Sequence, residues 1–235
     1  MEVLTRVQTA GGQITFGVAT TRAERAAILA QRFRVYQRRG YYRPGLTVDR
    51  DEYDRKAVYF LAALRGGEMA DVMVGSARLM LREPDTSFRF LSQKSFQFAL
   101  PEAVREIPVH QREEVSRLVS ERPEGIVLGG LLTPLGLVQA ISEYSLRHDI
   151  RCGLATIKQR LLRAFHGLGI RFNAIPSARL IYPRDGAVSA YFYRHSDPVI
   201  PVYWLADEIA PSIQRAIAHY QDRQSPALSR RAVSS

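Results

Sequence analysis

Residues 13–19 alternate between hydrophobic and polar positions with a period of two, as in a strand that buries one face, and further stretches rich in hydrophobic residues are typical of strands. Turn residues separate these stretches, and Arg65-Gly66-Gly67-Glu68 predicts a hairpin between two of them. The predicted strands are 13–19, 57–64, 71–81, 113–119, 150–155, 172–182 and 188–193.

Hydrophobic residues spaced three and four positions apart predict helices between these strands. The first helix opens at Thr20-Thr21, because Glu24 stands where a capping box needs it, and runs through about Arg39 until Gly40 stops it. Further helices are predicted over 91–98, 133–148, 158–168 and 205–220. This order of elements predicts a mixed α/β or α+β fold, with helices on both faces of a sheet.

The chain shows no internal repeat and no composition shift that would mark a domain boundary. Its 235 residues are 46% hydrophobic, which is enough to bury one large core. We therefore expect a single domain over residues 1–223. The Ser/Arg/Pro-rich segment 224–235 is predicted to be a disordered tail.

The net charge of +10 indicates an acidic partner, which could be nucleic acid, anionic lipid or an acidic carrier protein. No zinc-finger or helix-turn-helix signature is present, so nucleic acid is not expected. The single Cys152 excludes an intramolecular disulfide, and the five histidines lack metal-ligand spacing, so no metal is expected. The N-terminus lacks a signal-peptide pattern and no apolar run is long enough to span a bilayer, which predicts a cytoplasmic protein.

The stretch Glu113-Glu114-Val115-Ser116-Arg117-Leu118-Val119 places charge inside an otherwise apolar strand. Regular alternation would put Glu114, Ser116 and Leu118 on one face and Val115, Arg117 and Val119 on the other. A buried carboxylate needs a partner or a chemical task. An edge strand with a solvated polar face is the simpler interpretation of this stretch taken alone.

Four motifs in order resemble the autoinducer-synthase branch of the GNAT-like acyltransferases. This branch includes acyl-homoserine-lactone synthases and long-chain N-acyl amino acid synthases. The motifs are Arg32-x-x-x-Tyr36, Asp51-x-x-Asp54, Gly75-Ser76-Ala77-Arg78-Leu79 and Glu114-x-Ser116-Arg117. The resemblance implies a GNAT-like, mostly antiparallel central sheet with helices on both faces. It also implies transfer of an acyl group from a thioester to an amine.

Glu114 is the candidate base that takes the proton of the amine, if burial raises its pKa toward working pH. Ser116 would line the same cleft, and both form the candidate catalytic pair. The alternatives are a structural ion pair for Glu114 and an ordinary strand serine for Ser116. The candidate substrate-binding residues are Arg32, Tyr36, Asp51, Asp54, Arg78 and Arg117, for which structural Arg–Asp pairing is the equal rival. The candidate acyl-tunnel residues are Leu79, Phe90, Phe96, Phe98 and Leu118, which could equally be ordinary core.

Two departures narrow the choice within this branch. Homoserine-lactone synthases usually carry a tryptophan just after the first helix, where this chain has Tyr41-Tyr42, and a Pro-Thr motif after the G-x-x-R-L strand, where this chain has Leu81-Arg82-Glu83-Pro84-Asp85. Both weaken a role for S-adenosylmethionine. The chain thus resembles most the N-acyl amino acid synthases, with a lactone synthase as the close alternative and a non-catalytic basic binding domain as a more distant one.

The donor is expected to be the acyl-phosphopantetheine of acyl carrier protein, with no permanently bound cofactor. The glycine-rich Q/R-x-x-G-x-G/A loop that holds CoA pyrophosphate in GNAT enzymes is missing, and Gly125 to Gly130 lacks its spacing. Acyl carrier proteins are strongly acidic, so a basic surface would attract them. The candidate docking residues are Arg147, Arg151, Lys158, Arg160 and Arg163. The expected partners are therefore acyl carrier protein and an amino acid, with peripheral membrane contact through the product.

Overall fold

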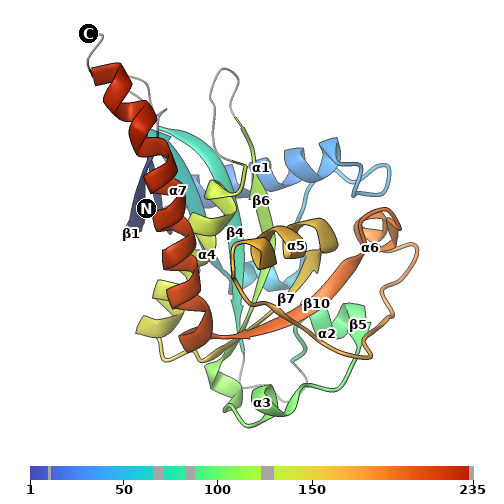
Figure 1. Cartoon of the computed structure of the whole chain (residues 1–235). Helices are drawn as coiled ribbons and strands as arrows, with labels where there is room; N and C mark the ends of the chain where they lie inside the picture. The colour runs from blue at the N-terminus through green and yellow to red at the C-terminus, as the bar shows by residue number, and fades with distance from the viewer. Residues whose placement is uncertain (10–11, 66–70, 83–87, 123–129, 233–235) are drawn as a thin grey trace.

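The computed structural model describes residues 1–9, 12–65, 71–82, 88–122 and 130–232, with side chains as far as residue 221. Its centre is an eight-stranded sheet in the order β1-β2-β3-β4-β6-β7-β10-β8 (Figure 1). Neighbouring strands are antiparallel, except that β6 and β7 are parallel. The strands are β1 (Glu2–Thr9), β2 (Gly12–Val18), β3 (Val58–Arg65), β4 (Val72–Leu81), β6 (Arg112–Ser120), β7 (Cys152–Lys158), β8 (Asn173–Ala174) and β10 (Val199–Leu205). A separate small sheet pairs β5 (Phe96–Gln97) with β9 (Arg179–Leu180).

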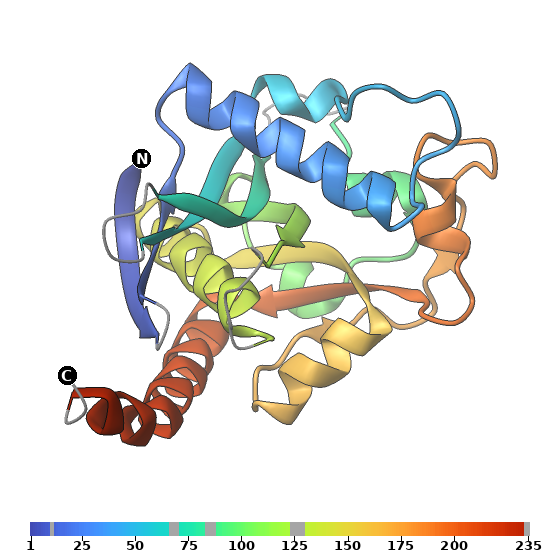
Figure 2. The same ribbon diagram turned by 90° about the horizontal axis from the view of Figure 1, so that it is seen from above.

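Helices cover both faces of the large sheet, as Figure 2 shows. They are α1 (Arg22–Arg38), α2 (Leu91–Ser95), α3 (Glu102–Arg105), α4 (Leu132–Arg147), α5 (Gln159–Gly167), α6 (Ser189–Tyr193) and α7 (Ala206–Ala232), with short 3-10 turns at Glu52–Arg55 and Val109–Gln111. On one face, Ile28 of α1 packs with Tyr59 and Leu61 of β3. The larger core lies on the other face, beneath α4, α5 and α7. This arrangement confirms the predicted fold class.

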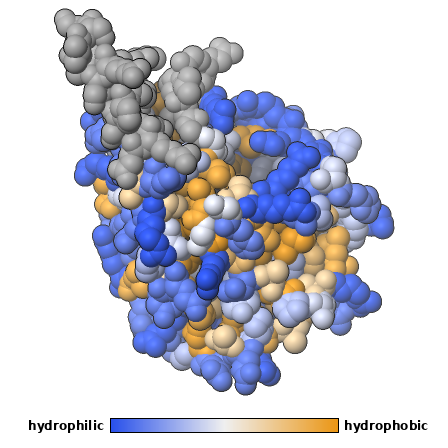
Figure 3. Space-filling view, viewed as in Figure 1, coloured by the Kyte–Doolittle hydropathy of each residue, from blue (hydrophilic) through white to orange (hydrophobic). Residues whose placement is uncertain are grey.

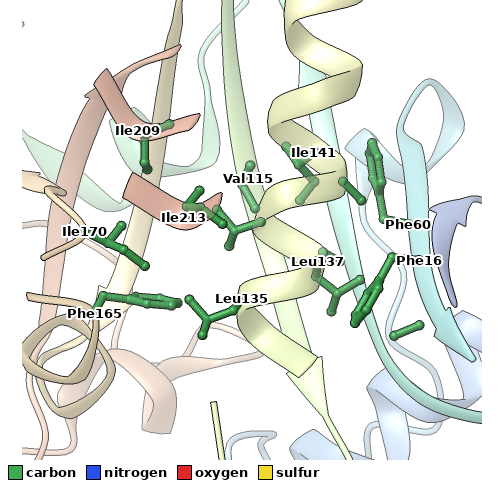
Figure 4. Close-up of a cluster of buried hydrophobic side chains, with 14 of the residues drawn as sticks. Phe16, Phe60, Val115, Leu135, Leu137, Ile141, Phe165, Ile170, Ile209 and Ile213 are labelled. Carbon is green, nitrogen blue, oxygen red and sulfur yellow. The ribbon is translucent and has the colours of Figure 1, made fainter. Parts of the chain in front are cut away.

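Helix α4 lies at the centre of the larger core. Figure 4 shows its Leu137 beside Phe16 and Phe60, and Phe165 of α5 beyond Leu135 on the opposite side. These side chains are almost fully buried. Burying a side chain of this size stabilises the fold by about 1.5 to 3 kcal/mol, so α4 holds the two halves of the sheet together.

The start of α1 is the one predicted from its sequence. Thr21 caps the helix: its hydroxyl accepts from the Glu24 amide at 3.1 Å, and a Glu24 carboxylate oxygen accepts from the Thr21 amide at 3.0 Å. Just beyond the helix end, Gly40 adopts φ +63°, a conformation that glycine allows at little cost. The capping box and the predicted stop are both confirmed.

Strands β2, β3, β4 and β6 and helices α1, α4 and α5 lie within a residue or two of their predicted ranges. The predicted hairpin turn falls largely in 66–70, outside the described residues. Two predicted strands are wrong. Region 172–182 contributes only the two-residue β8 and β9, because Pro176 interrupts it, and 188–193 contains α6, whose Phe192 packs among aromatic residues.

Three strands were not predicted: β1, β10 and the two-residue β5, which falls inside the predicted helix 91–98. β10 is an apolar run next to β7 whose buried residues do not follow a simple alternation, so it lacks the period-two signal. β1 is an edge strand with mostly exposed or half-buried residues. The final helix begins one residue after its predicted start and ends at Ala232 rather than Tyr220. No observation tests whether the segment from residue 224 is a disordered tail, and this stays a prediction. In the described residues, no helix is long and apolar enough to span a membrane.

Gly153 of β7 is a position where no side chain fits. A Cβ atom there would lie 2.0 Å from the indole of Trp204 on the neighbouring strand β10. We expect Gly153→Ala to lower the free energy of unfolding by about 1 to 3 kcal/mol, because overpacking forces the indole or the strand to move. Urea denaturation checks this, with Gly167→Ala as the control. No atom lies within 4 Å of a Cβ at Gly167, so that variant should be neutral or slightly stabilising. Equal effects of both substitutions would contradict the prediction.

Candidate active site

Strands β6 and β7 pair over only part of their length and then diverge. Their parallel register covers Arg112 to Val115 of β6 against Cys152 to Ala155 of β7. Beyond these pairs, the next residues of both strands, Ser116 to Ser120 and Thr156 to Lys158, line a cavity of about 420 Å³. The divergence therefore opens the sheet toward the space beneath α4 and α5.

The inner wall of this cavity, which we call the apolar cavity, is mostly hydrophobic. Side chains from α4, α5, α7 and β10 form it, among them Val138, Ile141, Leu161, Phe165, Trp204 and Ile209. Its polar lining includes Arg39, Lys158, Arg160 and Asp197. Figure 3 shows the corresponding face of the molecule, on which hydrophobic residues emerge between hydrophilic ones. A long hydrocarbon chain could occupy such a space.

A β-bulge in β6 decides which side chains meet near this cavity. The register between β4 and β6 shifts between Ser76 and Arg78, so Arg117 and Leu118 stand opposite one residue of β4. Arg117 has φ 54°, in the left-handed region that non-glycine residues rarely adopt. Such a bulge changes the face on which every following side chain lies.

The prediction of strict alternation along β6 is therefore wrong beyond Ser116. Arg117 reaches Asp49 on the α1 face, and Val119 packs with Tyr36 of α1. Leu118 instead packs against the larger core on the opposite face, which also contains Val115. The extra residue of the bulge brings Ser116 and Arg117 to the same face, and only structure reveals this.

Three arginines and three aspartates form a charge cluster on the α1 face: Arg32, Arg78, Arg117, Asp49, Asp51 and Asp54. Arg32 of α1 is 1% exposed. Its terminal nitrogens donate to both oxygens of Asp54 at 3.0 and 2.9 Å, and its Nε lies 2.5 Å from Asp49. Such bidentate pairs are among the strongest side-chain contacts.

Arg78 of β4 joins the cluster to the E-x-S-R strand. Its Nη1 contacts Asp51 at 2.6 Å and Asp54 at 2.8 Å, and its Nε donates to the Ser116 hydroxyl at 2.9 Å. Arg117 completes the cluster through Asp49 at 3.1 Å and Asp51 at 3.6 Å. The predicted residues thus come together, and the aspartates occupy much of the hydrogen-bonding capacity of the arginines.

The ionisation of Asp54 reflects this pairing. Burial alone would raise its pKa, but the hydrogen bonds and charge of Arg32, followed by the charge of Arg78, outweigh burial and hold the pKa of Asp54 well below its usual range. The positive charges of the three guanidinium groups and the negative charges of the three carboxylates cancel. Asp49, which was not among the candidate site residues, is the most buried of the three aspartates, at 3% exposure.

A second cavity of about 530 Å³ adjoins the charge cluster, and we call it the charged cavity. Its lining includes Asp49, Arg50, Asp51, Glu52, Lys94 and Arg117 together with Tyr42, Tyr53 and Tyr182. Leu91 and Arg117 line both cavities. The two cavities therefore adjoin at Arg117 and Leu91, a place that we call the junction, and the Nε of Arg117 is buried there without a hydrogen-bond partner.

Tyr36 lies where the aromatic residues gather around this junction. The Arg117 guanidinium sits 5.2 Å from its ring centroid, and the rings of Tyr41, Tyr42 and Tyr191 lie within 6.0 Å of it. An aromatic face attracts a cation at this distance. Tyr36 thus supports Arg117 and also lines the apolar cavity.

Glu114 is fully buried and faces neither cavity. Its carboxylate accepts from the Ser92 amide at 3.0 Å and from the Ser92 hydroxyl at 2.5 Å, at the start of α2. Burial raises the pKa of Glu114 to about 7, although the Ser92 hydrogen bonds and the charge of Arg78 work against the rise. Ser92, whose amide and hydroxyl hold this carboxylate, directly follows Leu91, which lines both cavities.

The five candidate docking residues do not share one surface. Arg147 ends α4 and Arg151 precedes β7, whereas Lys158, Arg160 and Arg163 lie at or beyond the other end of β7, roughly 20 Å away by strand rise. Lys158 and Arg160 alone among the five line the apolar cavity.

Lys158 is a buried cavity residue rather than a surface one. Its Nζ donates to the carbonyls of Tyr191 and Asp197 at 2.5 and 2.8 Å and lies 4.7 Å from the Tyr191 ring centroid. Burial lowers the pKa of Lys158 to about 8. No sequence signal separated this lysine from the exposed arginines around it.

Of the predicted acyl-tunnel residues, only Leu118 lines the apolar cavity. Leu79 lies in the larger core, and Phe90, Phe96 and Phe98 pack in smaller clusters, so these four residues line neither cavity. In the described residues, no group of three or more His, Cys, Asp or Glu side chains is placed to hold a metal ion.

Comparison with known proteins shows which solved structures share this fold. No protein-family model matches the chain, and no curated protein sequence matches it. Among solved structures, TofI in a ternary complex with an inhibitor and MTA is similar with a TM-score of 0.56 and 16% identity, covering 92% of this chain and 100% of that one. MesI, a CoA-dependent acyl-homoserine lactone synthase, is similar with a TM-score of 0.54 and 19% identity, covering 86% and 95%.

FeeM, an N-acyl amino acid synthase from uncultured soil microbes, is similar with a TM-score of 0.51 and 15% identity, covering 83% of this chain and 94% of that one. The resemblance predicted from four short motifs is thus confirmed at the level of structure. The chain has the fold that an acyl-homoserine lactone synthase shares with an N-acyl amino acid synthase.

Proposed function

We propose that this protein is an N-acyltransferase that moves a long-chain acyl group from the thioester of acyl carrier protein to the amine of an amino acid. The observation that carries the proposal is that two unlike cavities share Arg117 and Leu91 in their linings. One has an apolar interior and suits an acyl chain, while the other is charged and suits a zwitterion. A reaction that joins two such substrates needs their reacting atoms at one junction.

The amino acid would bind in the charged cavity. Arg117 offers its unpartnered Nε to the substrate carboxylate, because the other arginines of the charge cluster line neither cavity. Asp51 lines the same cavity and is 25% exposed, so its carboxylate is available to the substrate ammonium. In this proposal Arg32, Arg78 and Asp54 hold the cluster in shape, and Arg117 and Asp51 touch the substrate.

Amide formation requires the substrate ammonium to lose a proton before nitrogen attacks the thioester carbonyl. The carbon–sulfur bond then breaks, leaving the amide and the free thiol of the carrier. Glu114 takes the proton in this proposal, through the Ser92 hydroxyl or a water molecule, because its carboxylate does not reach the junction directly. Ser116 lines the apolar cavity and, through its bond to Arg78, fixes the geometry of the strand beside the thioester.

The donor is proposed to be acyl carrier protein because the chain carries a net charge of +10 and such carriers are acidic. Arg160 is exposed and lines the apolar cavity, so it lies where a carrier would deliver its acyl arm. Arg163 is also exposed on the same helix, whereas Arg147 and Arg151 lie too far from this opening to contact the same arm.

Expression in a bacterial host tests the function, because the host supplies acyl carrier protein and amino acids. Mass spectrometry of lipid extracts should show new N-acyl amino acids that are absent from the empty host. With purified enzyme, acyl carrier protein thioesters should be used more efficiently than the matching acyl-CoA. Acyl-homoserine lactones formed only with S-adenosylmethionine would assign the chain to the lactone alternative. The absence of any acyl product would contradict the acyltransferase proposal.

The role of Glu114 predicts a specific pH dependence. With a pKa near 7, the carboxylate ionises between about pH 6 and pH 8, so kcat/KM of the wild type should rise through this range. Glu114→Gln should lose this rise and lower kcat/KM by about 10² to 10⁴. Thermal unfolding should show that the variant remains folded. An unchanged pH profile in Glu114→Gln would assign Glu114 a structural role in holding α2.

A further inference from the structure

Two segments far apart in sequence form much of the wall of the charged cavity. They are residues 42–50, which follow α1, and residues 179–188, which lead into α6. The Arg43 amide donates to the Ala187 carbonyl at 3.1 Å and so ties the two segments together. Figures 1 and 2 both show them side by side at one side of the molecule. We call the exposed residues of these two segments the cavity rim.

The cavity rim presents aliphatic side chains to solvent. In the described part of the chain five large hydrophobic side chains are exposed, and two of them, Val48 at 49% and Ile181 at 46%, belong to the rim. Val48 and the exposed Pro183 also line the charged cavity, and Ile181 precedes Tyr182, which lines it too. Exposed apolar side chains that gather beside a binding cavity mark a surface for a partner.

The same rim is basic. It exposes four arginines, against one exposed acid, Asp185; the arginines are Arg43, Arg50, Arg179 and Arg184. Arg43 donates to the Asp185 carbonyl at 3.4 Å, Arg179 to the side-chain oxygen of Gln97 at 2.5 Å, and the Arg184 guanidinium lies 4.6 Å from the Tyr193 ring centroid. Within the described residues, none of the four forms an ion pair with a carboxylate. Their charges are therefore available to an anionic partner.

We propose that the cavity rim docks on an anionic lipid bilayer, where Val48 and Ile181 enter the boundary between headgroups and acyl chains and the four arginines contact lipid phosphates. Aliphatic side chains surrounded by arginines supply both contributions to such binding, the burial of apolar surface and the attraction to anionic lipid. The complementarity is one of charge and of hydropathy together, which distinguishes this surface from the exposed arginines elsewhere on the chain.

An acidic protein is the competing partner for a basic surface. In the proposed function the carrier delivers its arm at the apolar cavity, beside Arg160, whereas the rim borders the charged cavity. An N-acyl amino acid carries a long hydrocarbon chain, so it leaves the enzyme more readily into a bilayer than into water. This reason for a lipid contact rests on the proposed function, but the contact itself is measured without any substrate.

Vesicle co-sedimentation of the full chain tests the docking. The vesicles contain phosphatidylcholine alone or a mixture of phosphatidylcholine and anionic phosphatidylglycerol. The wild type should bind the anionic vesicles at least about tenfold more tightly than the neutral ones, and added salt should weaken this binding. Ile181→Asp, which removes an apolar side chain and adds a negative charge, and Arg184→Gln should each lower the affinity for anionic vesicles by about fivefold or more.

Leu146→Asp is the matched control, because Leu146 is 52% exposed near the end of α4, outside the rim, and the substitution changes charge and hydropathy in a similar way. It should leave vesicle binding unchanged, and circular dichroism should show that all variants are folded. Equal losses in Ile181→Asp and Leu146→Asp, or a wild type that does not prefer anionic vesicles, would overturn the inference.

Two further results keep this inference separate from the proposed function. If Ile181→Asp bound acyl carrier protein more weakly but vesicles as well as the wild type does, the rim would be a carrier surface and the lipid inference would be wrong. A protein that binds anionic vesicles through the rim but forms no acyl product would support the docking and contradict only the acyltransferase proposal.

Discussion

Arg32→Met is expected to lower the free energy of unfolding by about 3 to 5 kcal/mol, as removal of one partner from a buried ion pair usually does. The substitution keeps much of the side-chain volume but leaves Asp49 without its 2.5 Å contact and removes the bidentate partner of Asp54. Arg78 would still contact Asp54, and Arg117 would still contact Asp49. Two carboxylates would nevertheless share too little positive charge in a site with little access to water.

Urea denaturation of the wild type and the variant measures this effect. The matched control is Arg34→Met on the same helix, because Arg34 pairs with Glu121 at the surface and its side chain is 52% exposed. That pair should contribute less than about 1 kcal/mol. If Arg32→Met cost no more than Arg34→Met, the charge cluster would not hold the fold together, and a direct role of Arg32 in substrate binding would regain support.

The contacts of the charge cluster distinguish two roles for its arginines, pairing with the aspartates and binding a substrate. The sequence pattern places arginines and aspartates in one family-like order, but it does not say whether they bind each other or a substrate. In the structure, Arg32 and Arg78 line neither cavity, whereas Arg117 lines both. Substitution of Arg32 is thus expected to lower stability, and substitution of Arg117 to lower the affinity for the substrate.

The framework of the fold could be predicted because its signals are local. The capping box of α1 and the hydrophobic runs that form β3 and β4 depend on neighbouring residues, and both the helix start and the two strands were confirmed. The bulge at Arg117 was not predictable, because a single residue in the left-handed region leaves no mark in an alternating pattern. β10 was also missed, because its buried residues do not alternate and because it contains Pro201, a residue that argues against a strand inside a sheet.

The candidate site divides in the same way. The motifs brought Arg32, Arg78 and the aspartates together as their order predicted, whereas the residues that line the apolar cavity come from elements far apart in sequence. Lys158 is the clearest case. It looked like one more exposed basic residue, and only the approach of Tyr191 and Asp197 shows that its ammonium is enclosed. Tertiary contacts of this kind have no periodic signature in the chain.

Glu113→Gln is expected to remove a large pH dependence of stability, because Glu113 is a buried carboxyl that the fold holds in its protonated form. The Ser145 hydroxyl lies 2.6 Å from Glu113 Oε2 and 2.8 Å from the Ile141 carbonyl oxygen. One hydroxyl proton cannot serve both acceptors at once. A protonated Glu113 resolves this, since it donates to Ser145 while Ser145 donates to Ile141. Burial accordingly raises the pKa of Glu113 to about 8.

The sign of the effect follows from linkage. The pKa of Glu113 is higher in the folded than in the unfolded chain, so its contribution to stability is complete below about pH 4.5 and is lost as the pH rises through about 8. The full loss is on the order of 5 kcal/mol. Glu113→Gln carries no titrating proton, so it should unfold with a flatter dependence on pH and should exceed the wild type in stability above pH 8.

Urea denaturation at intervals from about pH 5 to pH 9 checks this prediction, with exposed Glu102→Gln as the control. The control should keep the slope of the wild type, part of which comes from Glu114, whose pKa burial also raises. A Glu113→Gln variant with the same slope as the wild type would show that Glu113 is ionised in the fold. Its contact with Ser145 would then be an ordinary hydroxyl-to-carboxylate hydrogen bond, and the Ile141 carbonyl would lose its share of the Ser145 proton.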